Sequence, residues 1–266
     1  MGADQAVSGA SGQGAARRRR RISRWLAITA SALAGLLALA VVGLLIWSGT
    51  GVMAAEPEPW QGVLDDPAVS VAQERDAVVL RPAHHTGPER GMVFYPGAKV
   101  EPEAYAARLS GLVVEDGMTV VIADPWLHLA LFDRRDPSTF TTHAPEVEEW
   151  FVSGHSMGGV RACQVAPESA GLLLLGSYCA TDLSGTQLPV LSIGGEQDGL
   201  STPEKISGAR DLLPGSASMV QVPGANHASF GDYGPQAGDG TARISDEEMT
   251  ARVTGLVHEE LLSAGA

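Results

Sequence analysis

The hydrophobic positions of the chain form one long run near the N-terminus and a series of short runs further on. Residues 25–47 contain no charged side chain, and Trp25 and Trp47 stand at the two ends of the run. As an α-helix these 23 residues extend about 34 Å, and the hydrocarbon core of a bilayer is about 30 Å thick. Tryptophan rings favour the membrane–water interface. The run therefore predicts one transmembrane helix.

The charges on the two sides of this run differ in sign. Five consecutive arginines occupy residues 17–21, whereas Glu56 and Glu58 follow the run. Because positive charge stays on the cytoplasmic side, the asymmetry predicts a cytoplasmic N-terminus and an extracytoplasmic body in the cell membrane. A cleaved signal peptide is the alternative, since residues 52–54 suit a cleavage site. The run exceeds the about 7–15 apolar residues of a usual signal peptide, which favours an uncleaved anchor.

These features divide the chain into four segments. Residues 1–24 are expected to form a basic cytoplasmic tail, and residues 25–47 the single membrane helix. Residues 48–74 are expected to form a linker, extended over the part at 54–66 that is rich in proline and acidic residues. Residues 75–266 remain for one folded domain, a length that suffices for a sizeable hydrophobic core.

Short apolar runs bounded by Gly, Pro or Asp recur along this domain and predict strands. The runs are almost wholly apolar, which is typical of strands buried on both faces of a parallel sheet. Because helical patterns lie between several of them, we expect an α/β domain of three layers with a mostly parallel sheet. The expected strands are residues 77–80, 92–95, 119–123, 150–153, 171–175, 190–194 and 218–222, and the expected helices are 103–114, 157–166, 203–213 and 246–263.

Charge and cysteine content exclude two classes of partner. The first 55 residues carry six arginines and one aspartate, a net charge of +5. The chain as a whole has a net charge of −13, so the remaining residues have a net charge of −18. An acidic body repels phosphate backbones, and no nucleic-acid partner is expected. The two cysteines, Cys163 and Cys179, form no C-x-x-C pair, so a thiolate metal site has no support. One disulfide and two buried thiols both remain open for them.

The sharpest motif is G-x-S-x-G, formed by Gly154, Ser156 and Gly158. It follows an apolar run and opens a helical stretch, the context in which such a serine is exposed above a sheet on a strained turn. Glycines on both sides remove clashes with neighbouring elements. The N-terminus of the following helix adds a positive dipole for a developing anion. The motif therefore predicts Ser156 as a nucleophile rather than as part of an ordinary Gly/Ser turn.

A serine nucleophile needs a base, and the base needs an acid that orients it. In this architecture the chain order is serine, acid, histidine. Asp198 lies 42 residues beyond Ser156, His227 lies 29 residues further, and each follows an apolar strand. We therefore expect Asp198 as the acid and His227 as the base. Asp182 and Glu196 are the rival acids, and ordinary loop positions are the alternative reading of both expected partners.

Acyl transfer also requires N–H donors for the oxyanion. The N–H of Met157, the residue after the nucleophile, is one expected donor. The second is expected in the loop that follows the strand at 92–95. Gly97 in that loop allows the unusual backbone that aims the next N–H, so Ala98 is the expected second donor.

With these residues in place, the chain resembles the α/β-hydrolase superfamily, in the compact branch of dienelactone-hydrolase-like esterases. The resemblance implies the α/β-hydrolase fold, the Ser156–Asp198–His227 assignment and substrates of the carboxylic-ester type. Where such enzymes usually have His-Gly before the oxyanion donor, this chain has Pro96-Gly97. The matching pieces are residues 94–98, 154–159, 194–198 and 224–227.

Together these features predict a serine hydrolase that cleaves a carboxylic ester or lactone through an acyl-enzyme, with no metal or organic cofactor. An envelope acyltransferase and a non-catalytic binding protein of the same fold are the alternatives. Members with a cap insert it between the strands expected at 171–175 and 190–194. Only about a dozen residues lie there, a short connection that predicts no cap domain. The sequence assigns no oligomeric state.

Overall fold

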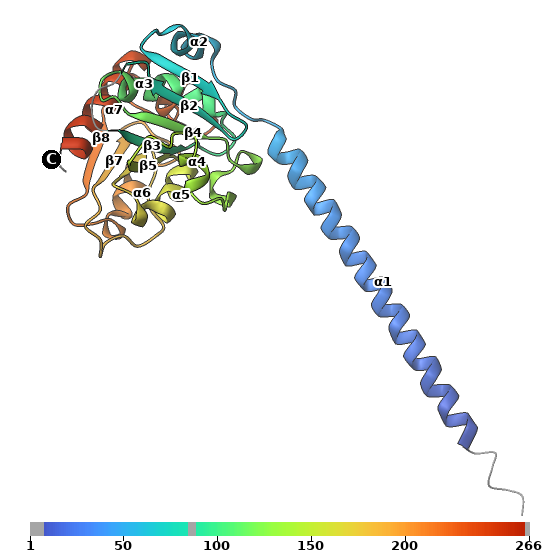
Figure 1. The fold of residues 1–266 in the computed structure, drawn as a ribbon. Coiled ribbons are helices and arrows are strands. Elements are labelled where there is room, and N and C mark those ends of the chain that lie inside the picture. Colours follow the sequence, from blue (N-terminus) through green and yellow to red (C-terminus); the bar gives the residue numbers. More distant parts are fainter. Residues whose placement is uncertain (1–7, 85–88, 264–266) are drawn as a thin grey trace, which may run out of the picture. The chain divides into compact units, whose positions relative to one another are not determined.

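The computed structural model describes residues 8–84 and 89–263. Contacts between residues divide the chain into two units, Met1–Thr50 and Gly51–Ala266. The first unit contains a single described helix, α1 (Ser8–Gly49), which Figure 1 shows in blue.

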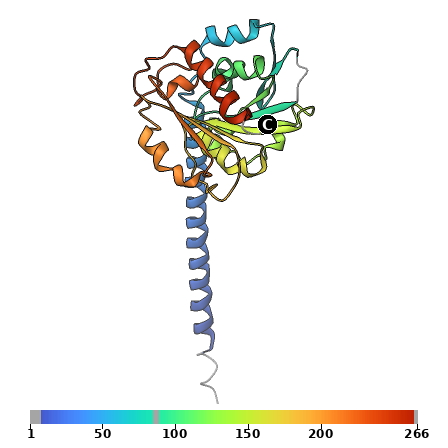
Figure 2. The ribbon, with the colours of Figure 1, turned by 90° about the vertical axis from the view of Figure 1, so that its left-hand side faces the viewer.

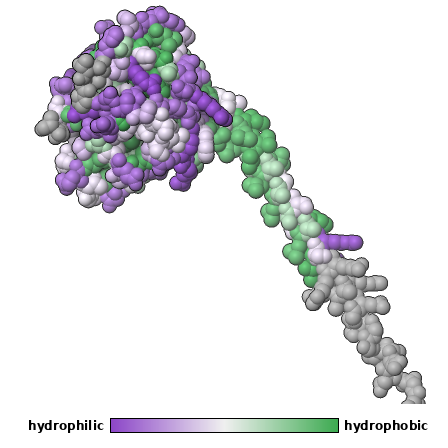
Figure 3. Space-filling model, viewed as in Figure 1, coloured by the Kyte–Doolittle hydropathy of each residue, from purple (hydrophilic) through white to green (hydrophobic). Residues whose placement is uncertain are grey.

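Helix α1 is long and apolar enough to cross a bilayer over the stretch Arg21–Gly49. Its large apolar side chains are exposed, and Figure 3 shows them as a largely hydrophobic surface along this part of the helix. By length and composition, α1 fits either a membrane anchor or a signal sequence.

The second unit is built around one sheet of eight strands in the order β1-β2-β4-β3-β5-β6-β7-β8. Strand β2 pairs antiparallel with β1 and β4, and all the other neighbouring strands are parallel. All seven strands predicted from the sequence are present, and β1 is an additional one. The strands are β1 (Val69–Gln73), β2 (Ala77–Pro82), β3 (Arg90–Tyr95), β4 (Thr119–Ala123), β5 (Glu149–His155), β6 (Leu172–Leu175), β7 (Val190–Gly195) and β8 (Ser218–Val222).

The central strands are buried on both faces, as their apolar sequences predict. In β4, Val120 and Ile122 belong to one hydrophobic cluster, whereas Val121 and Ala123 belong to the other. Successive side chains of a strand point to opposite faces, so the two clusters are the two faces of the sheet.

Helices cover both clusters. Helices α3 (Ala106–Val114) and α7 (Asp246–Val257) lie side by side over the first face, and α5 (Met157–Val165) and α6 (Pro203–Gly208) lie over the other (Figures 1 and 2). This confirms the three-layer arrangement. The remaining short elements are α4 (Ser138–Thr141), the 3-10 turns Pro102–Tyr105, Trp126–His128, Ala130–Phe132, Ala166–Glu168, Arg210–Leu212 and Ala228–Phe230, and a π-helical turn at His258–Leu262.

The expected helices are present with changes at their ends. The helix expected at 203–213 is divided into α6 and the 3-10 turn Arg210–Leu212. Ser245 caps α7 by accepting a hydrogen bond from the Glu248 N–H at 3.2 Å, in line with the N-cap position that a serine favours.

The extended conformation expected for residues 54–66 of the linker is wrong for most of that stretch. Residues Pro57–Asp65 form helix α2, which buries Val63 in the first cluster, and β1 pairs with β2 at the edge of the sheet. Pro57 lies in the first helical turn, where the missing N–H costs no hydrogen bond. A proline-rich composition therefore did not prevent a helix here.

Candidate active site

Four neighbouring parallel strands bring the predicted site residues to one edge of the sheet. Ser156 follows β5, Gly176 follows β6, Asp198 follows β7, and His227 comes a short turn after β8. Ligand sites of open α/β sheets lie at these carboxyl ends. The structure therefore gathers the expected serine, acid and histidine along the same edge.

Ser156 occupies a strained turn between β5 and α5. Its backbone has φ 53° and ψ −123°, a conformation that residues with a side chain rarely adopt. A Cβ at Gly154 would collide with the backbone of Gly158, and one at Gly158 would collide with the carbonyl oxygen of Tyr95. Both glycine positions are therefore closed to any side chain, because the obstacles are backbone atoms that cannot swing away.

The turn is also held from β6. The Ser156 N–H donates to the carbonyl oxygen of Leu175 at 3.1 Å, and the Ser177 hydroxyl donates to the Ser156 carbonyl oxygen at 2.6 Å. A disulfide joins Cys163 in α5 to Cys179, with 5.6 Å between their Cα atoms. The sequence left the state of the two cysteines open, and the structure links them. The segment after β6 is thus tied both to the serine and to the helix that follows it.

Asp198 and His227 form a buried pair. Asp198 Oδ2 lies 2.8 Å from His227 Nδ1, and the two residues are 3% and 1% exposed. The other oxygen, Oδ1, accepts the N–H groups of Leu200 and Ser201 at 2.8 and 2.7 Å. A carboxylate only accepts hydrogen bonds, so Nδ1 of His227 carries the donated proton. The Nε2 atom of the same ring is then the basic nitrogen.

The rival acids lie in surface turns. Asp182 accepts hydrogen bonds from the N–H and hydroxyl of Ser184, and Glu196 accepts the N–H of Gly224 at 2.9 Å. These bonds lower the pKa of both carboxyl groups, the largest cause being the Ser184 hydroxyl at Asp182 and the Gly224 N–H at Glu196. Asp198 differs from both in its contact with a buried histidine.

Chain order alone does not single out His227, because His258 also follows Ser156. The structure separates the two histidines by their surroundings. The His258 side chain is 64% exposed, and its Nδ1 lies 2.6 Å from Oδ1 of Asp116, which is 142 residues away in the sequence. His227 is the one whose ring is enclosed beside Asp198.

In the loop after β3, the Ala98 N–H lies between two N–H groups that are hydrogen-bonded. The Gly97 N–H donates to the Tyr105 hydroxyl at 2.9 Å, and the Lys99 N–H donates to the His128 carbonyl oxygen at 2.8 Å. Between them, the Ala98 N–H has no partner in the part of the chain that the structure describes. Met157 opens α5, so its N–H has no acceptor within the helix. The sequence predicts these same two N–H groups as the oxyanion donors.

Backbone strain is concentrated around this edge. Among the described residues, four that are not glycine have positive φ, and they are Lys99, Leu127, His128 and Ser156. Lys99 is bonded to His128, which joins the loop after β3 to the loop after β4. The strained positions are therefore the nucleophile turn and the two loops next to the Ala98 N–H.

His155 is a buried neutral residue beside the pair. The Tyr105 hydroxyl accepts the Gly97 N–H at 2.9 Å, and its oxygen lies 3.0 Å from His155 Nδ1. The ring centroids of His155 and His227 are 4.4 Å apart. Burial, and after it the neighbouring His227, lowers the pKa of His155 well below its usual value, although the His227 backbone carbonyl opposes this. His155 therefore packs against His227 and contacts Tyr105, whose hydroxyl holds the loop after β3.

The sequence did not identify Asp239. Residues 230–243 are rich in glycine, and their sequence is equally typical of a flexible surface loop and of a loop that borders a pocket. In the structure, Asp239 accepts the N–H of His227 at 3.1 Å and that of Ala228 at 2.9 Å. An Asp-Gly dipeptide is also an ordinary turn signal, so nothing in the local sequence distinguishes this aspartate.

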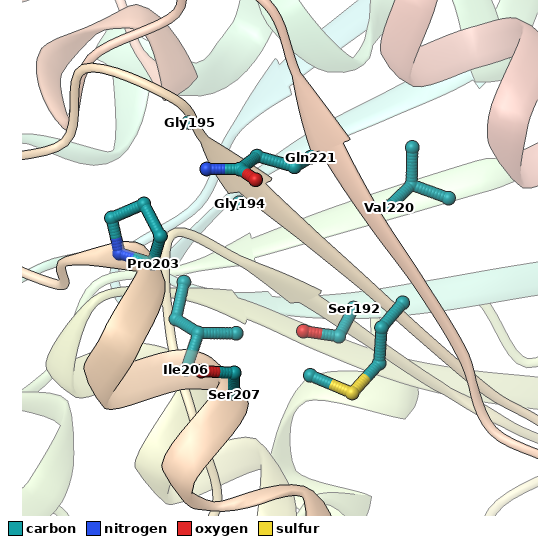
Figure 4. A pocket seen from close by; sticks show the side chains of 9 residues that line it. Ser192, Gly194, Gly195, Pro203, Ile206, Ser207, Val220 and Gln221 are labelled. Atoms are coloured by element: carbon teal, nitrogen blue, oxygen red, sulfur yellow. The ribbon is translucent and has the colours of Figure 1, made fainter.

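A separate cavity of about 160 Å³ lies between α6, β7 and β8 (Figure 4). Its lining includes Ser192, Ile206 and Met219 but neither Asp198 nor His227. It is therefore distinct from the buried pair. Within residues 8–84 and 89–263, no group of three or more His, Cys, Asp or Glu is arranged to hold a metal ion.

The fold is similar to that of several solved esterase structures. A thermophilic esterase from Thermogutta terrifontis has 15% identity and a TM-score of 0.53, and the match covers 74% of this chain and 99% of that one. A thermostable esterase from Pseudomonas putida has 16% identity and a TM-score of 0.53, covering 74% and 84%. Est1E from Butyrivibrio proteoclasticus has 14% identity and a TM-score of 0.51, covering 73% and 99%.

Comparison with curated proteins gives no match. The family model described as "Alpha/beta hydrolase family" matches residues 91–251, which include the nucleophile turn, Asp198 and His227. This match covers more than half of the chain. The chain therefore belongs to the alpha/beta hydrolase family.

Proposed function

We propose that this protein is a serine hydrolase that cleaves a carboxylic ester or lactone, with Ser156 as nucleophile, His227 as base and Asp198 as orienting acid. The observation that carries the proposal is the buried 2.8 Å contact between His227 and Asp198 at the sheet edge where Ser156 turns. Ionised carboxylates and imidazoles are costly to bury unless their partners are fixed. A buried acid–histidine pair beside a strained serine is the arrangement that acyl transfer requires.

The reaction begins with transfer of the Ser156 hydroxyl proton to Nε2 of His227. The alkoxide then attacks the ester carbonyl, and the C–O bond to the alcohol breaks as His227 returns the proton to the leaving oxygen. Water, deprotonated by His227 in turn, releases the acid from the acyl-enzyme. Asp198 keeps the ring in the correct tautomer throughout and stabilises the imidazolium.

The N–H groups of Met157 and Ala98 hold the oxyanion in this proposal. Both lack partners among the described residues, while Gly97 and Lys99 on either side of Ala98 are engaged. Donors that are already oriented and unpaired lower the energy of the tetrahedral intermediate without reorganisation. Gly154 and Gly158 serve the same step indirectly, because they allow the turn that exposes Ser156.

Within the family, we place the protein in the compact, dienelactone-hydrolase-like branch and propose that it has no cap domain. The connection between β6 and β7, all of which the structure describes, contains no helix. A short connection of this kind leaves the substrate cleft open, which favours small esters or lactones over substrates that require enclosure.

We further propose that α1 is an uncleaved anchor in the cell membrane, with residues 1–24 cytoplasmic and the hydrolase domain outside. The arginines before the apolar stretch support this orientation. The Cys163–Cys179 disulfide supports it as well, since disulfides persist in oxidising compartments. Sequencing the N-terminus of the mature protein from membranes tests it: an intact N-terminus agrees, and cleavage near residues 52–54 contradicts the anchor.

The test of function is hydrolysis of short p-nitrophenyl esters by the full chain in detergent, beside its Ser156→Ala variant. We expect turnover in the parent, loss in the variant, and labelling of Ser156 by a serine-reactive phosphonate. An envelope acyltransferase would instead give mainly acyl transfer when an alcohol acceptor is added. Equal rates near zero in both folded proteins, with no labelling of the parent, would favour a non-catalytic binding protein.

A further inference from the structure

The carboxylate of Asp239 connects the loops that carry the acid and the base. We infer that Asp239 is a positioning residue that holds His227 in register with Asp198, an inference that rests on the proposed function. Asp239 belongs to the glycine-rich loop after His227, is partly buried, and does not itself contact the imidazole ring in any hydrogen bond of the described chain.

One carboxylate accepts four backbone N–H groups. Its Oδ1 accepts from Gly199 at 3.0 Å, from His227 at 3.1 Å and from Gly240 at 2.7 Å, and its Oδ2 accepts from Ala228 at 2.9 Å. Hydrogen bonds to an ionised acceptor are stronger than those between neutral groups. The backbone of the residue after the acid and the backbone of the base itself are therefore fixed to the same pair of oxygen atoms.

Close packing holds the glycine-rich loop, and with it Asp239, against the backbone near Asp198. A Cβ at Gly240 would collide with the carbonyl oxygen of Gln197. A Cβ at Gly199 would lie only 2.6 Å from the carbonyl oxygen of Gly238. The side-chain amide of Asn226 also donates to the Gly240 carbonyl oxygen at 2.8 Å. The glycine-rich loop thus lies directly against the backbone around Asp198 and His227, and Asp239 is its charged contact with both.

The chain offers a matched control in Glu196. Glu196 also joins the ends of β7 and β8, because its carboxylate accepts the Gly224 N–H at 2.9 Å. It bonds neither His227 nor the residue after Asp198. If joining the two strand ends were the whole role of Asp239, removal of Glu196 would have a similar effect.

The experiment compares the full chain in detergent with its Asp239→Ala, Asp239→Asn and Glu196→Ala variants. We expect Asp239→Ala to lower kcat about 100-fold with KM near the parent value, because small displacements of a catalytic group cost that much. Asp239→Asn keeps one carbonyl oxygen and should lose less. Glu196→Ala should keep the kcat of the parent. Far-UV circular dichroism and thermal unfolding show that each variant is folded.

A second readout does not depend on turnover. Nitrogen NMR of the His227 ring reports whether the proton stays on Nδ1, facing Asp198. We expect a fixed Nδ1–H in the parent and in Glu196→Ala, and averaging between the two ring nitrogens in Asp239→Ala. The inference is overturned if Asp239→Ala keeps the parent's ring signals, or if Glu196→Ala changes kcat as much. If the parent hydrolyses no ester and the phosphonate probe does not label Ser156, the proposed function is wrong. The ring signals of His227 alone then decide the role of Asp239.

Discussion

Oδ2 of Asp198 lies 2.8 Å from Nδ1 of His227, with both side chains closed off from solvent. The acid can therefore hold the imidazole in one tautomer only while it remains a pure acceptor. An amide at this position presents an N–H to the ring and favours the other tautomer, which leaves a proton on the nitrogen that must act as base.

We accordingly expect Asp198→Asn to lower kcat by about 10³- to 10⁴-fold with little change in fold. Steady-state ester hydrolysis measures this. Asp182→Asn is the control, because Asp182 accepts hydrogen bonds from Ser184 in an exposed turn. A large loss in Asp182→Asn together with a small one in Asp198→Asn would reverse the assignment of the acid.

The glycine at the start of α5 gives a second prediction. A Cβ at Gly158 would collide with the backbone oxygen atoms of Tyr95 and Pro96, so Gly158→Ala should destabilise the domain by about 3 kcal/mol or more. In contrast, Gly255 in α7 has open space around its Cβ position. Gly255→Ala should be neutral or stabilise by up to about 1 kcal/mol through helix propensity. Denaturant unfolding of both variants checks the contrast, and equal stability would refute it.

The disulfide gives a third prediction. Cys163 and Cys179 are 16 residues apart, and closing a loop of that length stabilises by about 3 kcal/mol. The double variant Cys163→Ala, Cys179→Ala should therefore lower Tm by about 6–12 °C for a domain of this size. Adding a reductant to the parent should lower its Tm by a similar amount, and should leave the Tm of the variant unchanged. An unchanged parent Tm after complete reduction would contradict the prediction.

Two histidines should give opposite pH dependences of stability. The pKa of buried His155 is lowered, so below about pH 6.5 the unfolded chain takes up a proton that the folded chain refuses. Stability is therefore lost as the pH falls. The pKa of His258 is raised, mainly by its hydrogen bond to Asp116, so its contribution is present at low pH and is lost as the pH rises through the folded pKa.

Thermal unfolding between pH 5 and pH 8 separates these effects. His155→Gln should make the loss of Tm on acidification shallower, whereas His258→Gln should make it steeper. If both variants lose Tm on acidification with the same slope as the parent, neither histidine controls stability on the acid side.

The sequence predicted the central sheet because its strands are buried on both faces and therefore read as unbroken apolar runs. Strand β1 was not predicted, because it lies at the edge of the sheet and Val69 is its one buried residue. Helix α2 was missed because its proline and acidic residues resemble a linker. Its burial depends on contacts with α3 and β1 that local composition does not show.

For the site, chain order and the ends of the strands were enough to indicate Ser156, Asp198 and His227 for testing. The contacts that hold the loops around these three residues could not be predicted from the sequence. Tyr105 meets His155 across 50 residues, and Asp239 meets Gly199 across 40. No spacing or periodicity connects such pairs, because they meet only when the loops at the sheet edge fold together.

The clustering of positive φ at Lys99, Leu127, His128 and Ser156 has a consequence for protein engineering. Replacing a strained residue by glycine or asparagine relieves an unfavourable backbone, so a screen for heat resistance will be drawn to these four positions. They are the proposed nucleophile itself and three residues of the two loops next to the Ala98 N–H. Thermostable variants selected there will tend to be slow enzymes, and variants selected elsewhere in the domain will be free of that trade-off.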